Sequence, residues 1–178
     1  MTFSAAAILA ASLIATPVLA QANDHAHDFD FLVGKWHVHH WRLKDRLAGS
    51  HEWVEFDGTL ENWATMNGQG NVDDTYLDPP NGAYRAVAPR SYDPKTETWA
   101  IWWLDGRDPQ TIGPPMIGSF KDGVGTFLGP DMLRGKPVLA RFLWTKITPN
   151  SAHWEQAYSP DGGKTWETNW RMEITRVQ

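Results

Sequence analysis

"GKWHVHHW", residues 34–41, decides the fold, because this stretch suits either the first strand of a β-barrel or part of a metal site. It contains three of the chain's seven histidines and two of its eleven tryptophans. Successive side chains of a strand point to opposite faces, so Trp36 and His40 would share one face, and His37 and His39 the other. A large apolar ring indicates the buried face, and Trp36 and His40 are therefore expected to point inward.

After this stretch, turn signals recur at short intervals along the chain. They lie at residues 57–58, 78–82, 93–98, 105–110, 122–123, 134–137, 148–151 and 159–166. Aromatic, β-branched and polar residues alternate between them, which is typical of antiparallel strands joined by hairpins. No stretch after residue 30 keeps an apolar helical period, so at most a short helical turn is expected before the first strand.

The predicted fold is all-β: a single antiparallel up-and-down β-barrel of about eight to ten strands, over residues 31–178. Closure removes the exposed strand edges that an open sheet of this length would present. A barrel of this size is also wide enough to hold a small ligand. With an even number of strands, the last strand runs antiparallel to the first, so its C-terminal end returns to the end of the barrel where the first strand begins.

The composition favours one globular domain with a substantial core. The 178 residues are 42% hydrophobic and 12% aromatic. The net charge of -5 provides no basic surface for nucleic acid. Cysteine is absent, which excludes disulfides, cysteine–metal sites and cysteine nucleophiles. The sequence contains no phosphate loop or dinucleotide fingerprint, and it predicts no cofactor; the oligomeric state stays open.

Residues 1–20 have the pattern of a secretory signal peptide. Their apolar run over residues 5–15 has no charged side chain and is too short to span a bilayer. Small residues permit cleavage after Ala20 or, alternatively, after Ala22. We expect an exported protein, resident in the periplasm of a Gram-negative bacterium, with no stable membrane span after cleavage. Residues 21–30 would then form a flexible segment before the barrel.

Gly34-Lys35-Trp36 resembles the Gly-x-Trp signature of the calycins, the lipocalins and their relatives. The resemblance implies that Gly34 lets the chain enter the closed end of the barrel and that Trp36 covers it. It also implies a last-strand arginine lying across that tryptophan. The last strand offers one apolar face, made of Trp166, Trp170, Met172, Ile174 and then Arg176. Arg176 is therefore expected to make a cation–π contact with Trp36.

The resemblance extends beyond this signature. The segments "FDFLVGKWHV", "FDGT", "YDP", "DGVGTF" and "DGGKTWETNW" together resemble a family of calycin-like bacterial exported proteins of unknown function. This similarity covers nearly all of the chain after the signal peptide. It implies a barrel, and it implies no particular reaction.

The segment "SPDGGKTW", residues 159–166, matches the Asp-box pattern known from sialidase propellers. In such a hairpin, Asp161 accepts N–H groups of the turn, Gly162 and Gly163 supply positive φ angles, and Trp166 packs beneath the turn. A single copy on a short chain indicates a structural hairpin rather than a sialidase.

An inward His40 needs a polar partner, because burying an unpaired imidazole is costly. Glu52 and Arg141 are the candidate partners, and together with His40 they could provide the acid/base group of an enzyme. The candidate ligand-binding residues are His40, Arg42, Trp103, Gln156 and Tyr158. The same polar residues could equally form an internal network that only fixes the fold. A bulge in any strand would reverse these assignments.

Histidine positions also suggest two ways to bind a metal, although the sequence favours none. His37 and His39 share one face of their strand, and His51 could complete the ligand set. Alternatively, these histidines are simply exposed on a polar wall. Cleavage after Ala22 would make His25 the third residue, which suits Cu(II) or Ni(II). Cleavage after Ala20 would instead leave His25 in a flexible tail.

Three functions follow from this interpretation. The leading hypothesis is a barrel that binds a small, partly apolar ligand in its lumen. The second is a cofactor-free isomerase, lyase or hydrolase that uses the inward histidine, carboxylate and arginine. The third is a structural or interaction module of the cell envelope. An open lumen would favour the first, a His40–carboxylate pair the second, and a filled lumen the third.

Overall fold

The structure, a computed structural model, describes residues 25–178. The predicted signal peptide, both possible cleavage sites and the first two residues of the possible copper site lie outside the described residues. Within residues 25–178, every helix falls short of the length and apolar character needed to cross a membrane.

The described chain consists of short 3₁₀ helices and eleven strands. The helices are η1 (His25–His27), η2 (Asp30–Leu32) and η3 (Met66–Gly68). The strands are β1 (Gly34–Leu43), β2 (Trp53–Thr65), β3 (Gly70–Leu77), β4 (Tyr84–Asp93), β5 (Thr98–Ile101), β6 (Leu104–Asp105), β7 (Met116–Lys121), β8 (Val124–Leu133), β9 (Lys136–Thr145), β10 (Ser151–Ser159) and β11 (Glu167–Arg176).

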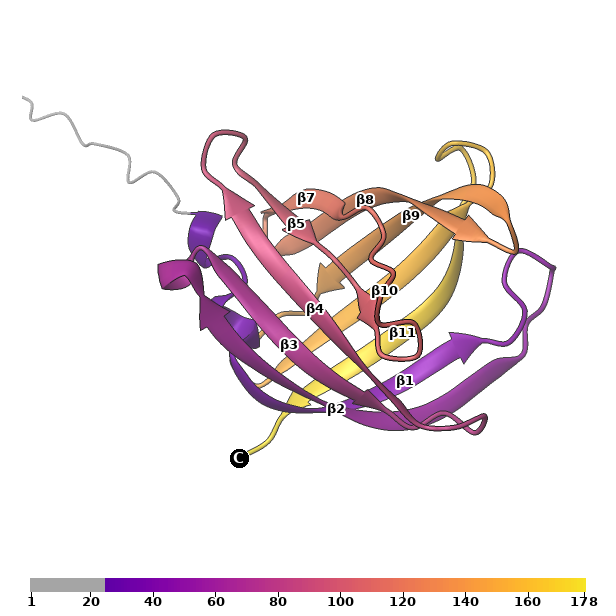
Figure 1. Cartoon of the computed structure of the whole chain (residues 1–178), viewed down its shortest axis with the longest axis horizontal. Helices are drawn as coiled ribbons and strands as arrows, with labels where there is room; N and C mark the ends of the chain where they lie inside the picture. Colours follow the sequence, from indigo (N-terminus) through magenta and orange to yellow (C-terminus); the bar gives the residue numbers. More distant parts are fainter. Residues whose placement is uncertain (1–24) are drawn as a thin grey trace, which may run out of the picture.

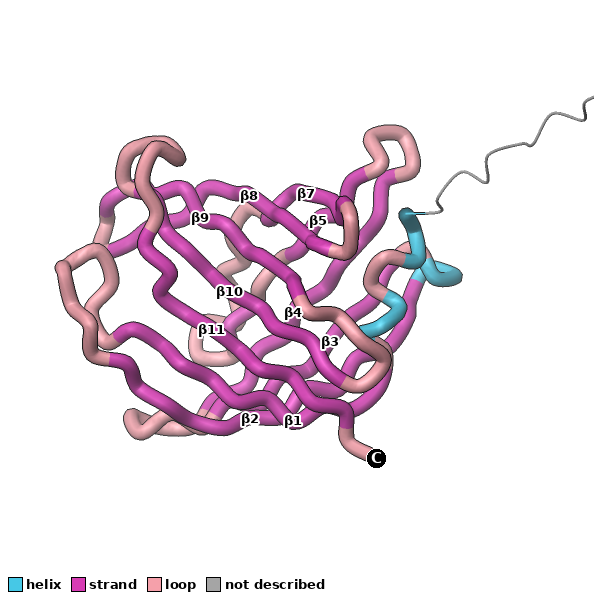
Figure 2. Tube along the Cα trace, turned by 180° about the vertical axis from the view of Figure 1, so that it is seen from behind, coloured by secondary structure: helices cyan, strands magenta, loops and turns pink. Residues whose placement is uncertain are grey.

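Ten of these strands close into an antiparallel barrel in sequence order, and the short β6 adds to β4 beside the ring. The last strand, β11, pairs with β1 and so closes the wall, as an even number of strands requires. Figures 1 and 2 show the continuous wall from opposite sides, with η1 and η2 at the end where the chain terminates. The predicted all-β up-and-down barrel is therefore confirmed.

One predicted turn, at residues 57–58, is wrong, because Gly58 lies in the middle of the long strand β2. A side chain at Gly58 would collide with the carbonyl oxygen of Tyr76 on β3 and crowd Nε2 of His40. Glycine is therefore required here by a close approach of strands and of the His40 ring, and it does not mark a reversal of the chain.

The end of the barrel next to η2 is filled solidly, and we call this end the floor, made of Phe29, Leu32, Trp36, Trp99 and Phe127. Each of these side chains is at most 1% exposed. The Phe29 ring meets the Trp99 ring edge to face, with 5.1 Å between their centroids. Trp36 donates its indole N–H to the carbonyl of Leu32 at 2.7 Å, which ties β1 to the helix that precedes it.

Arg176 lies across the outside of this floor. Its guanidinium carbon is 4.1 Å from the centre of the Trp36 ring. The same guanidinium donates hydrogen bonds to the carbonyls of Phe31, Val33 and Pro149 at 2.7–2.8 Å. Gly34 has a φ of +122°, and a Cβ there would meet Nη1 of Arg176. Gly34 is thus needed for its backbone conformation and for the room that it leaves.

The expected flexible segment, residues 21–30, is corrected from His25 onward. Residues 25–27 and 30–32 form helices η1 and η2, and Phe29 between them is fully buried in the floor. His25 is held in place, since its imidazole N–H donates a hydrogen bond to the Asp28 carboxylate and its carbonyl accepts one from the Trp99 indole. An apolar ring with a place in the core orders the chain before the first strand.

The hairpin between β10 and β11 has the geometry of an Asp box. Asp161 accepts hydrogen bonds from the backbone N–H and the hydroxyl of Thr165 and from the Ser159 hydroxyl, and these bonds lower its pKa to about 2. It also accepts the backbone N–H of Lys164. Gly163 has a φ of +95° and accepts the indole N–H of Trp166 on its carbonyl. This hairpin stabilises itself locally and lies apart from the lumen.

Candidate functional site

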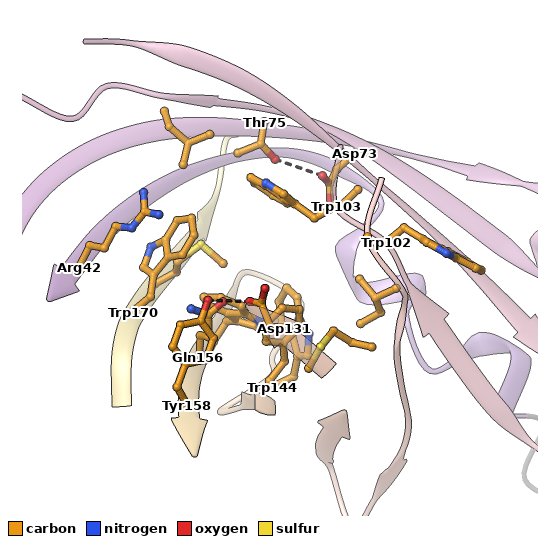
Figure 3. A pocket seen from close by; sticks show the side chains of 18 of the residues that line it. Arg42, Asp73, Thr75, Trp102, Trp103, Asp131, Trp144, Gln156, Tyr158 and Trp170 are labelled. Carbon is orange, nitrogen blue, oxygen red and sulfur yellow. Dashed lines mark hydrogen bonds between the residues drawn. The ribbon is translucent and has the colours of Figure 1, made fainter. Parts of the chain in front are cut away.

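The barrel encloses a cavity of about 520 Å³ between the floor and the opposite end of the wall, and we call this cavity the lumen. Most of the residues that line it are apolar, and they include the aromatic and thioether side chains of Trp102, Trp103, Phe142, Trp144, Trp154, Trp170, Met116, Met132 and Met172. Figure 3 shows several of these rings turned toward the open space. The lumen is therefore open rather than filled by its own side chains.

His40 points inward from β1 and is completely buried. Trp170 donates its indole N–H to Nδ1 of His40 at 3.2 Å, and the Phe56 ring stacks on the imidazole at 4.6 Å. Because Nδ1 accepts this bond, the proton of the neutral ring lies on Nε2. Burial lowers the pKa of His40 to about 3. The ring is thus a neutral part of the lumen wall at physiological pH.

The two predicted partners of His40 do not reach it. Glu52 lies in the loop before β2, where its exposed carboxylate binds Lys44 at 2.9 Å. Arg141 follows the alternation of β9 to the outer face, because its neighbour Phe142 lines the lumen. There its guanidinium stacks on Trp166 at 4.5 Å. The proposed His40–Glu52–Arg141 cluster is therefore corrected: these side chains occupy three separate environments.

A β-bulge explains why Trp166 also lies outside. Gln156 of β10 pairs with Trp170, but the next residue, Ala157, pairs with Thr168, so Asn169 is an extra residue in β11. Trp166 therefore lies on the opposite face from the one expected by simple alternation with Trp170. The sequence-based assignment is correct from Trp170 to Arg176 and reverses before the bulge.

Gln156 and Tyr158, predicted to face the lumen, both line it from β10. Gln156 donates an amide N–H to the side-chain oxygen of Asn169, the extra residue of the bulge, at 2.8 Å. Tyr158 donates its hydroxyl to Asp131 of β8 at 2.7 Å. Burial, together with the nearby Asp131 carboxylate, raises the pKa of Tyr158 to about 12. Figure 3 shows this pair at the lumen wall.

A buried ion pair between Asp73 and Arg90 lies at the inner end of the lumen, and sequence analysis missed it. The carboxylate and guanidinium approach to 2.6 Å, with side chains only 1% and 5% exposed. Asn71 accepts a hydrogen bond from Arg90, and Thr75 donates one to Asp73. The signal was present as polar residues alternating along β3, but such a pattern usually indicates an outer face.

At the end opposite the floor, four side chains form what we call the mouth: Arg42, Arg46, Tyr84 and Trp103. Arg42 stacks on Trp170 at 4.4 Å and donates to the Tyr84 hydroxyl at 3.3 Å. Arg46, in the loop after β1, donates to the Tyr158 hydroxyl at 3.4 Å. Burial is the main cause that lowers the pKa of Arg42, followed by repulsion from Arg46.

Trp103 lines the lumen and is 38% exposed, so the lumen reaches the surface beside it. Its ring meets Trp170 edge to face, with 6.2 Å between centroids. Trp102 and Trp103 follow β5, which ends at Ile101. The chain leaves the wall there, which brings both Trp102 and Trp103 to the lumen rather than to opposite faces.

The histidines proposed as metal ligands lie outside the lumen. His37 and His39 face outward from β1, and Nδ1 of His39 bonds Asp57 at 2.8 Å. His51 is exposed in the loop before β2, well beyond the position where His39 pairs with Asp57. Among residues 25–178, no group of three or more histidine, aspartate or glutamate side chains is arranged to hold a metal ion.

Comparison with known proteins identifies the fold. No protein-family model and no curated protein matches the chain. Among solved structures it is similar to the S-type phycobiliprotein lyase CPES from Guillardia theta, at 12% identity and a TM-score of 0.57, covering 84% of this chain and 90% of that one. It also matches EF1p2_mFAP2b bound to DFHBI, at 10% identity and a TM-score of 0.47, covering 86% and 100% respectively. At these identities the similarity to the lyase concerns architecture alone, and residues 25–178 form a calycin-like barrel.

Proposed function

We propose that the protein binds a small, partly apolar ligand inside the lumen. The observation that carries this proposal is the open cavity of about 520 Å³, which lies within the range of about 300–1,000 Å³ typical of small-molecule sites. Its walls combine many apolar rings with a few polar groups, among them Arg42, Gln156 and Tyr158. Such a wall desolvates a flat ligand and orients it through a small number of hydrogen bonds.

The state of His40 favours binding over acid/base catalysis. A general acid or base works best with a pKa near the operating pH, whereas the pKa of His40 is about 3. Its Nδ1 is already occupied by the indole of Trp170. Phe56 covers one face of the ring. We therefore assign His40 the role of a neutral wall residue that holds Trp170 in position.

We also propose that the barrel acts after export, as a member of the calycin-like bacterial exported proteins that its motifs resemble. The support is the uncharged apolar run at residues 5–15 followed by small residues at both possible cleavage sites. The intact mass of the protein recovered from a periplasmic fraction tests this point. A mass beginning at Gln21 or Asn23 is expected, and a mass that retains Met1 would contradict export with cleavage.

A fluorescent probe tests lumen binding directly. N-phenylnaphthylamine is small, flat and uncharged, and its emission rises in apolar surroundings. Ala88 of β4 is buried and lines the lumen. The preceding residue, Val87, lies on the opposite face of the strand, away from the lumen. Ala88→Phe should fill the lumen and abolish binding of the probe, whereas the control Val87→Phe should leave binding unchanged.

Each variant needs a melting curve to show that it is folded. Equal binding by the wild type and by Ala88→Phe would place the probe outside the lumen and contradict the proposal. Absence of binding to the wild type would contradict it as well.

A further inference from the structure

The mouth contains a cationic group that the chain itself does not neutralise. Among residues 25–178, no carboxylate lies within 4.0 Å of the Arg42 guanidinium, whose only hydrogen-bonded partner is the neutral Tyr84 hydroxyl. Nε of Arg42 is buried and has no partner among the described residues. A partly buried guanidinium without a counter-ion is costly, and an anion from outside would offset that cost.

Two carboxylates beside the mouth, those of Asp105 and Asp131, already have partners. Asp105 binds Arg107 through both carboxylate oxygens. Asp131 accepts the Tyr158 hydroxyl at 2.7 Å, and the same hydroxyl accepts from Arg46 at 3.4 Å. Arg46 therefore has a carboxylate one hydroxyl away, whereas Arg42 has none. The excess positive charge of the mouth is concentrated at Arg42.

The surroundings of Arg42 define what an anion there would be attached to. The guanidinium carbon of Arg42 lies 4.4 Å from the centre of the Trp170 ring, so the cation is held against an aromatic face. Below it, Trp170 meets Trp154 edge to face at 5.6 Å and Trp103 at 6.2 Å, so the adjoining wall is aromatic. Figure 3 shows Arg42 beside Trp170 at one end of the space and Trp103 across it.

We propose that the ligand is a flat, largely apolar anion whose carboxylate or sulfonate group binds Arg42 at the mouth while its body lies against Trp170, Trp154 and Trp103. This inference rests on the proposed lumen binding and adds the chemical class of the ligand. Arg46 supports the site as a second, partly neutralised cation.

Two probes with the same aromatic body separate charge from shape. Anilinonaphthalene sulfonate carries an anionic group, and N-phenylnaphthylamine lacks it. The wild type should bind the anion more tightly. Arg42→Gln should lower the affinity for the anionic probe by roughly 10- to 100-fold, as for the loss of a charge-assisted hydrogen bond. It should change the affinity for the neutral probe by less than about twofold. The control Arg85→Gln removes an exposed arginine on the outer face of β4 and should change neither.

The failures of the two proposals are distinguishable. Binding of the neutral probe together with equal affinity for the anion, unaffected by Arg42→Gln, would overturn the anion site and leave lumen binding intact. Binding of neither probe would overturn both. If Arg42→Gln does not fold, Arg42→Lys and Arg46→Gln decide. Lysine keeps the positive charge but lacks the planar guanidinium, so Arg42→Lys should bind the anionic probe less tightly than the wild type. Unchanged affinity for the anionic probe in both variants would contradict the proposal.

Discussion

Both ends of the barrel carry aromatic rings, and the two ends differ in how these rings are packed. At the floor, five apolar side chains are at most 1% exposed, and Trp36 satisfies its N–H on the Leu32 carbonyl. At the mouth, Trp103 is 38% exposed and borders open space. Aromatic content therefore does not distinguish core from site; the packing around the rings does.

Because of this difference, we expect the floor to determine the stability of the barrel and the mouth to determine its affinity for a ligand. Substitutions at the floor remove close-packed contacts and should lower the free energy of unfolding. Substitutions at the mouth border empty space and should change ligand affinity more than stability. The Asp73–Arg90 pair lies at the boundary, because Arg90 lines the lumen and also lies 5.3 Å from the Phe29 ring of the floor.

Trp36→Ala should give the largest loss of stability, about 3–5 kcal/mol, as for other large buried aromatic side chains. Urea unfolding followed by far-ultraviolet circular dichroism measures it. The matched substitution at the mouth, Trp103→Ala, should cost much less because this ring is partly solvated. Equal losses for the two tryptophans would break the comparison between floor and mouth.

Arg90→Met should cost about 3 kcal/mol, because it leaves the Asp73 carboxylate buried without its counter-ion. The double variant Asp73→Leu/Arg90→Met removes both charges and should recover most of that loss. A double-mutant cycle from urea unfolding provides the coupling free energy. Additive losses would show that the two charges do not stabilise one another.

His40 should make the barrel less stable in acid. Its pKa in the folded protein, about 3, lies below the unfolded value of about 6.5, so its contribution is complete above pH 6.5 and declines as the pH falls. Over this interval the unfolded chain binds a proton that the folded ring does not, which lowers the free energy of unfolding by about 3 kcal/mol near pH 4 to 4.5.

The variant His40→Gln should therefore show a shallower loss of stability between pH 6.5 and 4, as measured by urea unfolding at each pH. The adjacent His39 is the control. Its bond to Asp57 on the outer wall raises its pKa, so its small contribution is present in acid and declines as the pH rises through the folded value. An acid slope that is identical in wild type and His40→Gln would contradict the burial of a neutral ring.

Arg176→Ala should have the smallest effect of the series, about 2 kcal/mol. A cation–π contact alone would suggest about 0.5–1 kcal/mol, but the structure adds three hydrogen bonds to backbone carbonyls. Part of the loss should be shared with Trp36, which a double variant measures. Strict additivity of Trp36→Ala and Arg176→Ala would mean that their contact contributes nothing.

The sequence was sufficient for the barrel because local patterns determine it. Alternation from Trp36 to His40, the even strand count and the position of Arg176 follow from the two-residue period of strands and from hairpin connections. The same period fails wherever the wall is irregular. The bulge at Asn169 reverses the face of Trp166, and the end of β5 at Ile101 moves Trp102 and Trp103 to the lumen.

The candidate site was only partly predictable, because side chains from distant strands meet there. His40, Arg42, Gln156 and Tyr158 face the lumen by simple alternation. The partners of such residues depend on strand register, which the sequence does not encode locally. Glu52 was therefore a wrong choice for His40, and Trp170, which is 130 residues away along the chain, is the true partner.

The most direct test of the account is a crystal of the protein soaked with iodobenzoate, with the iodine located by anomalous scattering. We expect an iodine peak inside the lumen beside Trp170, Trp154 or Trp103, with the carboxylate oriented toward Arg42. Ala88→Phe crystals treated in the same way should lack that peak. Iodine found only on the outer wall, with an unoccupied lumen in the wild type, would contradict the central claim that the open end of this barrel is a binding site.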